Sequence, residues 1–341
     1  MVTDRPSIAA LMSTYNSAVH IRATIDSVLA QSVKDFEFII VDDGSTDQTV
    51  EIIKSYQDPR IHLFCRAENR GVGYSLIQAM TYVTAPVVIK IDSDDLSHYL
   101  RFEKQLRFLQ ENPDIGLVKC YFEYFSDDLE ILNSQRFQDR IRDAVYINSI
   151  NTEQLINENL PRWLCIEHTT YCARTFHIRA TGYQDQRLCE DYSLFYRMHQ
   201  NGCRMACLPE VLVKMRLSNN SLTASLDAEK RQLWFSHLVA LKLPKIATLT
   251  GASKKLAIYG TGGLAREMYQ LLTEAGFLVC NFIEQTAKDD VIIGSTHIRV
   301  AALKECLEQK ILIAAQPVRL KVMQQLLEMD LVEWRDFMVV A

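Results

Sequence analysis

The sequence predicts an α/β fold in which a largely parallel sheet is followed by a second, smaller α/β unit. Short apolar runs alternate with amphipathic helical patterns from residue 7 to about residue 124, and this alternation is typical of β-α-β units. Polar and mostly acidic turns follow three of the expected strands, where α/β proteins bind their ligands. A glycine-rich turn at residues 260–263 lies within a second alternation of the same kind.

Four strands and four helices are expected in the first part of the chain. Each expected strand is a short apolar run, as a strand buried on both faces requires. The helices follow apolar residues spaced three or four apart, and Ser45 with Gln48 predicts a capping box before the second helix. The strands are expected at 8–11, 36–41, 61–64 and 87–91, and the helices at 21–29, 49–56, 74–83 and 100–110.

Changes in this pattern predict the domain boundaries. Between about residues 125 and 225 the alternation fades into a mixed segment rich in Arg, Tyr, Asn and Glu, which we assign to the first domain as the half that receives a substrate. A helix is expected at 227–243, where Pro244 and a Thr-Leu-Thr-Gly-Ala-Ser run interrupt it. The expected domains are 1–226, a helical linker at 227–252 and a small α/β domain at 253–341.

Composition and charge exclude several classes of protein. The 341 residues favour two domains, and 37 basic against 42 acidic side chains give a net charge of −5, so no positive field attracts nucleic acid. The first apolar run is too short for a signal peptide, and no stretch approaches the ~18 apolar residues of a membrane helix. Nine cysteines without a C-x-x-C pair indicate neither a disulfide framework nor a zinc ribbon, so a cytoplasmic protein is expected.

The acidic run Asp92-Ser93-Asp94-Asp95 directly follows an apolar strand. Carboxylates at a strand end can hold a hard divalent cation, and such a cation commonly neutralises phosphate. Three carboxylates within four residues repel one another unless a cation or solvent compensates them. Taken alone, the run is equally well explained as a solvated acidic loop.

Two further strand ends carry polar residues of the same kind. Asp42-Asp43-Gly44-Ser45 follows the second expected strand, and Ser13-Thr14-Tyr15-Asn16 follows the first. Tyr15 offers a face on which a base can stack, and Asp42 or Asp43 can accept the imino hydrogen of uracil. Each motif alone is compatible with ordinary turn chemistry, but together they predict a nucleotide pocket.

Five motifs in this order resemble those of a known enzyme family. They are S-T-Y-N at 13–16, V-D-D-G-S-T-D at 41–47, E-N-R-G at 68–71, D-S-D-D at 92–95 and C-E-D-Y at 189–192. The chain resembles the family 2 glycosyltransferases with the GT-A fold over about residues 6–223. The resemblance implies a nucleotide-sugar donor, usually linked to UDP, a Mn²⁺ or Mg²⁺ ion on the D-x-D motif, and an inverting displacement at the anomeric carbon.

The resemblance also implies roles for individual residues around the donor. Asp92 would face the ribose, and Asp94 would coordinate the ion that bridges the two phosphates. Such an ion stabilises the charge that develops on the leaving nucleoside diphosphate. Asp43 (or Asp42) would contact the uracil. The remaining nucleotide-binding positions would be Thr14, Tyr15, Asn16, Arg70 and Ser93.

The acceptor hydroxyl loses a proton as it attacks, so the reaction needs a general base on the face opposite the departing diphosphate. Asp191 resembles the aspartate of the family's E-D motif at the start of a helix, and Glu190 beside it would orient the acceptor. Without the other motifs, the same pair is explained as a plain acidic helix start. The family also often places basic residues in this later segment, which here contains Arg174, Arg197 and Arg216.

The glycine turn of the last domain has the form of a dinucleotide-binding turn. Gly260, Gly262, Gly263 and Ala265 match a G-x-G-x-x-A pattern between a strand and a helix, and Glu284 ends the next strand, where a ribose-binding acid belongs. The 89 residues from 253 leave no room for a hydride-transfer domain. The domain at 253–341 therefore resembles a Rossmann-like unit. Two interpretations remain: a site for a regulatory nucleotide or sugar nucleotide, or a degenerate Rossmann fold used for dimerisation or partner docking.

Taken together, the sequence predicts a metal-dependent inverting glycosyltransferase that moves a sugar from a nucleotide sugar, expected to be a UDP-sugar, to an acceptor hydroxyl. The acceptor is left open among a glycan, a lipid-linked sugar and a protein, as are peripheral association with the inner face of the membrane and a homo-oligomer. The Q-x-x-R-W motif of processive synthases is absent after Asp191, which favours one transfer per encounter. The rival functions are a non-catalytic sugar-nucleotide sensor and a nucleotidyltransferase.

Overall fold

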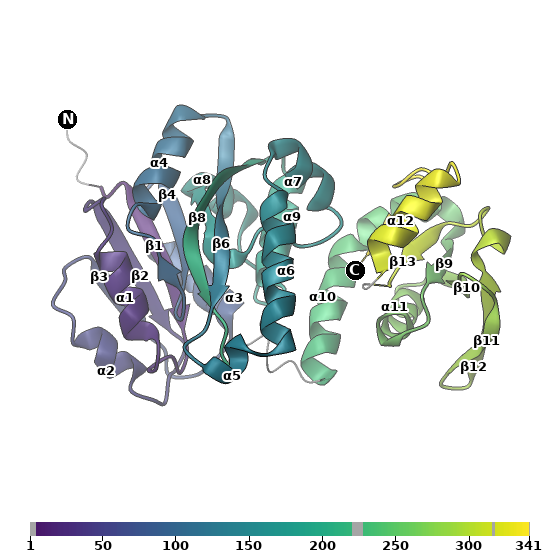
Figure 1. Cartoon of the computed structure of the whole chain (residues 1–341), viewed down its shortest axis with the longest axis horizontal. Helices are drawn as coiled ribbons and strands as arrows, with labels where there is room; N and C mark the ends of the chain where they lie inside the picture. Colours follow the sequence, from purple (N-terminus) through teal and green to yellow (C-terminus); the bar gives the residue numbers. More distant parts are fainter. Residues whose placement is uncertain (1–4, 220–227, 316–317, 341) are drawn as a thin grey trace. The chain divides into compact units, whose positions relative to one another are not determined.

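The computed structural model describes residues 5–219, 228–315 and 318–340. Packing of the backbone divides the chain into two compact units, Met1–Ser225 and Leu226–Ala341, which are drawn in sequence colours in Figure 1. Each unit has its own sheet.

The first unit is built on a mixed sheet of eight strands among the described residues. They are β1 (Ile8–Thr14), β2 (Phe36–Asp42), β3 (Ile61–Cys65), β4 (Val87–Asp92), β5 (Leu96–Ser97), β6 (Ile115–Phe125), β7 (Tyr171–Arg174) and β8 (Arg204–Arg216). Their order across the sheet is β3-β2-β1-β4-β7-β6-β8-β5. The first four pair in parallel, whereas β7 runs antiparallel to both β4 and β6.

The parallel part of this sheet is covered on both faces, which is why β1, β2 and β4 read as continuous apolar runs. One face carries the main core, to which three helices contribute Ile25, Ile53 and Phe102. The other face is covered by a helix that contacts β1 and β2 and buries Leu76 and Ala79 (Figure 1). These helices are α1 (Ile21–Leu29), α2 (Thr49–Lys54), α4 (Arg101–Glu111) and, on the second face, α3 (Val72–Tyr82).

The segment after β6 forms regular helices and strands, although no individual strands or helix bounds are predicted for it from the sequence. β6 pairs with β8 along nearly its whole length, and β7 lies between β4 and β6. The partners of these strands are distant in sequence, so local pattern does not reveal them. The helices of the segment are α5 (Leu129–Leu132), α6 (Gln135–Ser149), α7 (Glu153–Asn159), α8 (Thr175–Thr181), α9 (Glu190–Gln200) and the 3₁₀ turn η1 (His168–Thr170).

The second unit is a smaller α/β structure. Its helices are α10 (Ala228–Thr250), α11 (Gly263–Glu274) and α12 (Arg319–Glu328), with 3₁₀ turns η2 (Gly251–Ser253) and η3 (Leu303–Glu305). Its strands are β9 (Lys255–Tyr259), β10 (Leu278–Glu284), β11 (Lys288–Ile293), β12 (Thr296–Ala302), β13 (Ile311–Ile313) and β14 (Phe337–Val339). They lie in the order β11-β12-β10-β9-β13-β14, and all pair in parallel except β11 with β12.

Two local expectations are wrong, and one pair of strands is missing from the prediction. The helix expected to stop at Pro244 continues through it to Thr250 as α10, which groups with the second unit. The expected capping box does not form, because the Ser45 hydroxyl accepts from the Asn16 amide and the Gln48 side chain makes no cap. The hairpin of β11 and β12 is absent from the predicted elements.

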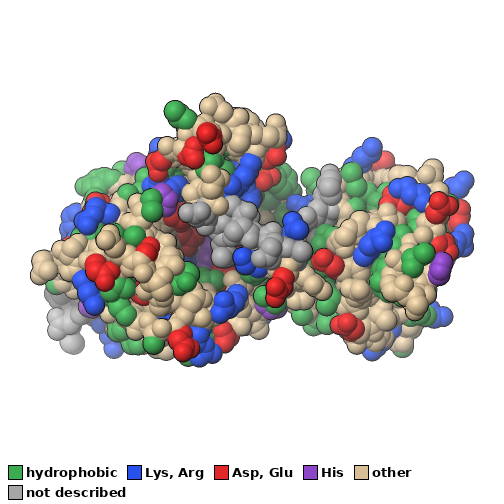
Figure 2. Space-filling view, turned by 90° about the horizontal axis from the view of Figure 1, so that it is seen from below, with side chains coloured by type: hydrophobic (Ala, Val, Ile, Leu, Met, Phe, Trp, Pro, Cys, Tyr) green, Lys and Arg blue, Asp and Glu red, His purple; other side chains and the backbone are tan. Residues whose placement is uncertain are grey.

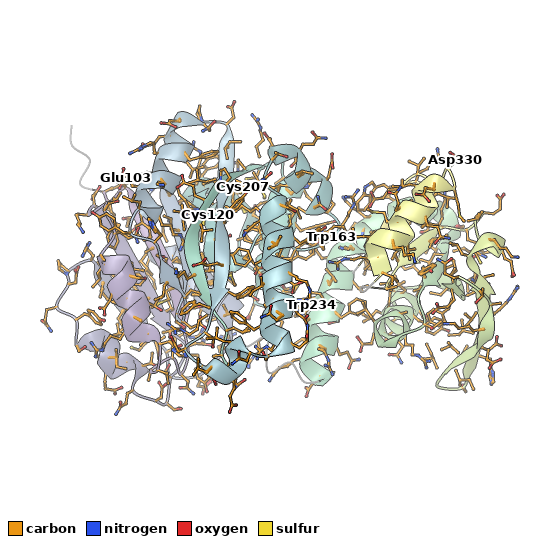
Figure 3. The ribbon with its side chains drawn as sticks, viewed as in Figure 1. Glu103, Cys120, Trp163, Cys207, Trp234 and Asp330 are labelled. Carbon is orange, nitrogen blue, oxygen red and sulfur yellow. The ribbon has the colours of Figure 1, made fainter. Side chains whose placement is uncertain are left out.

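Cysteines contribute to packing rather than to cross-links. All nine are free thiols, and seven of them are buried. Cys120 on β6 and Cys207 on β8 are labelled in Figure 3, and both belong to the buried core. Among the described residues, no helix is both long and apolar enough to span a bilayer.

Candidate active site

Three adjacent parallel strands end at one edge of the first sheet. The pairing places Thr14 of β1 opposite Asp42 of β2, and Ser13 opposite Asp92 of β4. The three polar motifs predicted from the sequence therefore lie side by side at the carboxyl ends of the strands, where ligands of α/β proteins bind.

Hydrogen bonds join the loops that follow β1 and β2. Asn16, in a left-handed conformation with φ +47°, donates from its backbone to the Ser45 hydroxyl at 2.9 Å. Its side-chain oxygen accepts from the Thr46 backbone at 2.8 Å. Tyr15, held between these contacts, leaves 46% of its surface exposed. The arrangement fixes the loop and presents an aromatic ring to solvent.

Asp43 organises the E-N-R-G loop. Its buried carboxylate accepts from the backbone amides of Arg70 at 3.1 Å and Gly71 at 2.7 Å, and the Arg66 guanidinium lies 3.4 Å away. The neighbouring Asp42 accepts from the Ser45 amide at 3.0 Å, and its other oxygen is buried without a hydrogen-bond partner among the described residues. Asp43 therefore has hydrogen-bond partners for both carboxylate oxygens, whereas Asp42 has a partner for only one among the described residues.

A buried lysine stands behind the D-S-D-D motif. Lys90 of β4 is fully buried, and its ammonium pairs with Asp92 and donates to the Ile91 carbonyl at 2.7 Å. Burial opposes ionisation of Asp92, but the charge and hydrogen bond of Lys90 together with the charge of Arg101 outweigh it, so the pKa of Asp92 is lowered. Lys90 is not among the site residues predicted from the sequence, although a lone lysine inside the apolar run V-V-I-K-I is a usable signal.

The remaining acids of the motif are held against the end of β8. Arg216 donates from its backbone to Asp95 at 2.8 Å and from its side chain to the Asp94 carbonyl at 2.9 Å. Burial and the charge of Asp92 raise the pKa of Asp94 to about 6. Burial and the charges of Asp94 and Asp92 raise the pKa of Asp95 well above its ordinary value. Ser93 bonds to the Ser17 hydroxyl at 2.8 Å.

The E-D motif opens α9. Glu190 and Asp191 occupy its first turn, where the helix dipole stabilises negative charge, and Cys189 before them is left-handed at φ +68°. Burial raises the pKa of Asp191 to about 6, the charge of Asp92 adds to this rise, and the Tyr192 amide at 2.6 Å opposes it. The ring of His168 in η1 lies 3.6 Å from the Glu190 carboxyl, and η1 contacts β4, so the fold brings the two acidic motifs near each other.

Two further residues complete this side of the site. The ring of His168 lies 3.6 Å from the Glu190 carboxyl and 3.1 Å from the Tyr183 hydroxyl. Burial and the charge of Lys90 lower the pKa of His168 to about 3, so the imidazole is neutral. Burial and the charge of Asp191 raise the pKa of Glu167 to about 7. No sequence signal distinguishes Glu167 from an ordinary glutamate.

Only one of the three arginines noted in the later segment lies at the acidic motifs. Arg216 does so through the contacts above. Arg174 instead donates to the Leu109 carbonyl at the end of α4, and Arg197 donates to the Thr181 carbonyl at the end of α8. The latter two therefore have structural roles.

The carboxylates at this site would bind a hard cation only together with oxygen atoms of a bound ligand. No three His, Cys, Asp or Glu side chains of the described residues form a ready metal-binding group. Asp92 and Asp94 nevertheless supply carboxylate oxygens, which hard cations prefer, and the raised pKa of Asp94 indicates negative charge in need of compensation. Figure 2 shows acidic side chains inside a hollow of the first unit.

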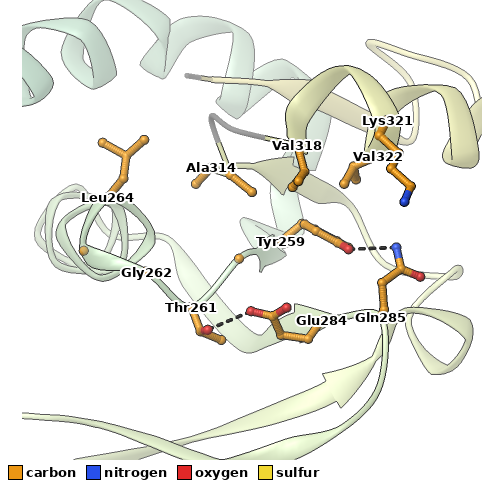
Figure 4. A pocket seen from close by; sticks show the side chains of 13 residues that line it. Tyr259, Thr261, Gly262, Leu264, Glu284, Gln285, Ala314, Val318, Lys321 and Val322 are labelled. Carbon is orange, nitrogen blue, oxygen red and sulfur yellow. Dashed lines mark hydrogen bonds between the residues drawn. The ribbon is translucent and has the colours of Figure 1, made fainter. Parts of the chain in front are cut away.

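The predicted residues of the second unit also converge. Gly260, Gly262, Gly263 and Glu284 line one cavity of about 510 Å³, shown in Figure 4. The cavity lies at the carboxyl ends of β9, β10 and β13. The Thr261 hydroxyl donates to the Glu284 carboxylate at 2.7 Å across its floor.

Comparisons with known proteins agree with this architecture. The family model described as Glycosyl transferase family 2 matches residues 9–180. EpsE of Bacillus subtilis (strain 168), which is assigned as a glycosyltransferase, is 28% identical over 242 residues that cover 65% of this chain and 79% of EpsE. The UDP-Gal:α-D-GlcNAc-diphosphoundecaprenol β-1,3-galactosyltransferase of Escherichia coli is 26% identical over 226 residues, or 65% of this chain and 78% of the enzyme.

A solved structure shares the fold. The mannosyltransferase PcManGT of Pyrobaculum calidifontis, in complex with GDP-Man and Mn²⁺, superposes with a TM-score of 0.54 at 20% identity, over 72% of this chain and 65% of that chain. The first unit thus has the GT-A fold, followed by a further α/β unit. The motifs, the fold and the family match agree, and the chain belongs to the family 2 glycosyltransferases of glycan biosynthesis.

Proposed function

We propose that the first unit transfers a sugar from a UDP-sugar to an acceptor hydroxyl, with inversion at the anomeric carbon and with a divalent metal ion. One observation supports the proposal: β4, which ends at the D-S-D-D motif, contacts η1, and the ring of His168 in η1 lies 3.6 Å from Glu190 of the E-D motif. The first motif suits a departing diphosphate, and the second suits a base on the opposite face.

The donor nucleotide would bind over the ends of β1 and β2. Thr14, Tyr15 and Asn16 would line the base and ribose, with the exposed ring of Tyr15 available for stacking. Asp43 (or Asp42) would contact the uracil. The loop that Asp43 holds would bring Arg70 beside the nucleotide, and Asp92 and Ser93 would approach the ribose.

The metal, Mn²⁺ or Mg²⁺, would be held by Asp94 together with the donor diphosphate. When bound, it would stabilise the negative charge that accumulates on the leaving nucleoside diphosphate. The raised pKa of Asp94 supports this assignment, because a cation would stabilise the charge of a carboxylate that burial and the Asp92 charge disfavour. The Mn²⁺ complex of PcManGT supports it by similarity.

Asp191 would accept the proton of the acceptor hydroxyl as that oxygen attacks. A base pKa of about 6 leaves the carboxylate ionised at neutral pH while keeping it more basic than an exposed aspartate. Glu190, whose pKa burial raises well above its ordinary value, would keep its proton and orient the acceptor by donating a hydrogen bond.

The acceptor would be a hydroxyl of a glycan, a lipid-linked sugar or a protein. The Escherichia coli relative acts on a diphosphoundecaprenol-linked sugar, which supports a lipid-linked acceptor by similarity. Such an acceptor would bring the protein to the inner face of a membrane from the cytoplasm.

Calorimetric titration with UDP and GDP, with and without Mn²⁺, tests the donor and the metal. We expect UDP to bind more tightly when Mn²⁺ is present, and Asp94→Ala to abolish that gain. Asp114→Ala, an 80% exposed carboxylate before β6, is the matched control and should bind as the wild type does. GDP binding above UDP would overturn the assigned donor, and a UDP affinity that Mn²⁺ does not raise, or a gain that persists in Asp94→Ala, would overturn the metal role.

Incubation with UDP-sugars and acceptors then separates the rival functions. Release of UDP that depends on the acceptor supports transfer. Binding without turnover would indicate a sugar-nucleotide sensor, and pyrophosphate released from a nucleoside triphosphate would indicate a nucleotidyltransferase.

A further inference from the structure

The cavity of the second unit lies where the order of its sheet changes direction. From β9 the chain proceeds to β10 and β12 on one side, and afterwards to β13 and β14 on the other. The connections therefore diverge beside β9 and leave a crevice at the carboxyl ends of the strands, which is where open parallel sheets bind ligands. Its volume of about 510 Å³ is sufficient for a nucleotide.

The glycines of the turn differ in what they require. Gly260 has φ +108°, and a Cβ there would lie 3.3 Å from the Ala315 side chain, so its conformation and packing both demand glycine. A Cβ at Gly262 or Gly263 would meet nothing within 4 Å, and Gly262 has an ordinary φ of −71°. Neither folding nor packing explains these two glycines, whereas close approach of a ligand to the backbone does.

The amino terminus of α11 opens at this place. Its N-cap Gly262 provides no side-chain cap, and no acidic residue occupies the first turn of this 12-residue helix. The first-turn amides therefore face the cavity side of the turn without a side-chain acceptor, at the positive end of the helix dipole. Lys321 of α12 lines the opposite side and adds a positive charge (Figure 4).

A carboxylate lies across the same cavity. Glu284 ends β10 with its side chain 20% exposed, accepts from Thr261 at 2.7 Å and lies 3.3 Å from the Lys288 ammonium. Those two contacts leave the carboxylate further lone pairs, which can accept from a pair of sugar hydroxyls. The same negative charge disfavours a phosphate on those hydroxyls.

We propose that the second unit contains a nucleotide site of its own, which needs no metal ion. Its ligand is a nucleotide with a pyrophosphate on the amides of Gly262 and Gly263 and a ribose with a free 2′-hydroxyl at Glu284. UDP-linked sugars and adenine dinucleotides share this chemistry. The proposal is independent of the transferase site, whose metal-dependent binding Asp94→Ala removes.

The test is a titration of the full chain carrying Asp94→Ala, in EDTA, with UDP, ADP-ribose and ADP-ribose 2′-phosphate. We expect UDP or ADP-ribose to bind at one site per chain, and the better of the two identifies the source. We expect the 2′-phosphate to bind at least tenfold more weakly than ADP-ribose. Absence of binding by all three at millimolar concentration would overturn the proposal.

Two variants of Gly262 assign the site. Gly262→Asp and Gly262→Asn have the same size and both are good N-cap residues, so both should keep or raise the thermal unfolding temperature. If a pyrophosphate binds there, the aspartate should weaken binding at least tenfold beyond the asparagine, because only it repels the anion. Equal effects of the two variants, or binding unchanged in both, would contradict the site. Glu284→Gln should reduce the discrimination against the 2′-phosphate, and unchanged discrimination would refute its role.

Discussion

At the scale of single residues, Asp94 and Asp191 have the same raised pKa although two different chemical roles are proposed for them. Burial raises the pKa of both to about 6, with the charge of Asp92 contributing to each. Asp94 follows directly on the strand that carries Asp92, whereas Asp191 lies in the first turn of α9 with one oxygen on the Tyr192 amide. The first is therefore suited to a cation, and the second to a proton.

Replacing Asp191 by asparagine should remove the base while preserving the shape of the helix start. We expect kcat to fall by ~10²–10⁴-fold, as is typical when a general base is lost. The affinity for UDP with Mn²⁺ should change little, because Asp191 is not assigned to the donor. Steady-state kinetics and calorimetry measure the two effects, and Asp114→Asn serves as the exposed control. An unchanged kcat would show that another group accepts the proton.

The same carboxylate predicts the pH dependence of the reaction. Only the ionised form of Asp191 accepts a proton, so kcat should fall as the pH decreases through about 6. The Asp92 charge and burial raise this pKa, while the Tyr192 amide and the Lys90 ammonium lower it. Glu167, with a pKa raised to about 7, is the nearby group that titrates next. A profile of kcat from pH 5 to 8 that stays flat would contradict the assignment.

At the scale of elements, α4 is hydrogen-bonded both to β4, which ends at the D-S-D-D motif, and to η1, which contains His168. Its Arg101 is buried and donates to the Lys90 carbonyl of β4 at 3.0 Å and to the Thr169 carbonyl of η1 at 2.6 Å. One side chain thus connects the two halves of the active site across the sheet.

Arg101→Met should consequently destabilise the first unit. Two buried carbonyls would lose a charged donor, and the expected cost is about 2–4 kcal/mol of unfolding free energy. The matched control is Arg107→Met on the same helix, which loses only an exposed pair with Glu103, labelled in Figure 3, and should cost less than ~0.5 kcal/mol. Urea unfolding measures both, and equal losses would show that the buried contacts contribute nothing special.

Elements that alternate locally were predictable, and those defined by distant partners were not. The predicted strand at 87–91 is β4, because a strand buried on both faces is one apolar run. β7 and β8 were missed, since their place depends on β4 and β6. The helix does not end at Pro244 as expected, because packing along a long helix outweighs the loss of the one backbone hydrogen bond that proline removes.

The site followed the same division. The acids of the motifs could be proposed as site residues because they are adjacent in sequence, at strand ends and at a helix start. Lys90, His168 and Glu167 were not assigned, because a single residue of each type has many ordinary explanations until the fold buries it beside Asp92 or Asp191. Residue type indicates capability, whereas burial and neighbours decide the role.

At the scale of the whole molecule, each unit has its own sheet and its own buried side chains. Met12 and Phe38 belong to the core of the first sheet, whereas Ile258 and Phe282 are buried on strands of the second. Binding energy should be expressed first in the stability of the unit that receives it.

Calorimetric unfolding should consequently show two transitions. UDP at about 100 times its dissociation constant in the presence of Mn²⁺ should stabilise the first unit by ~2.7 kcal/mol and shift that transition upward. Asp94→Ala should leave both transitions in place but abolish the shift, because the carboxylate would be lost without damage to either core. A single transition that UDP and Mn²⁺ move as a whole would show that the two units unfold together, and the separation of their stabilities would then be wrong.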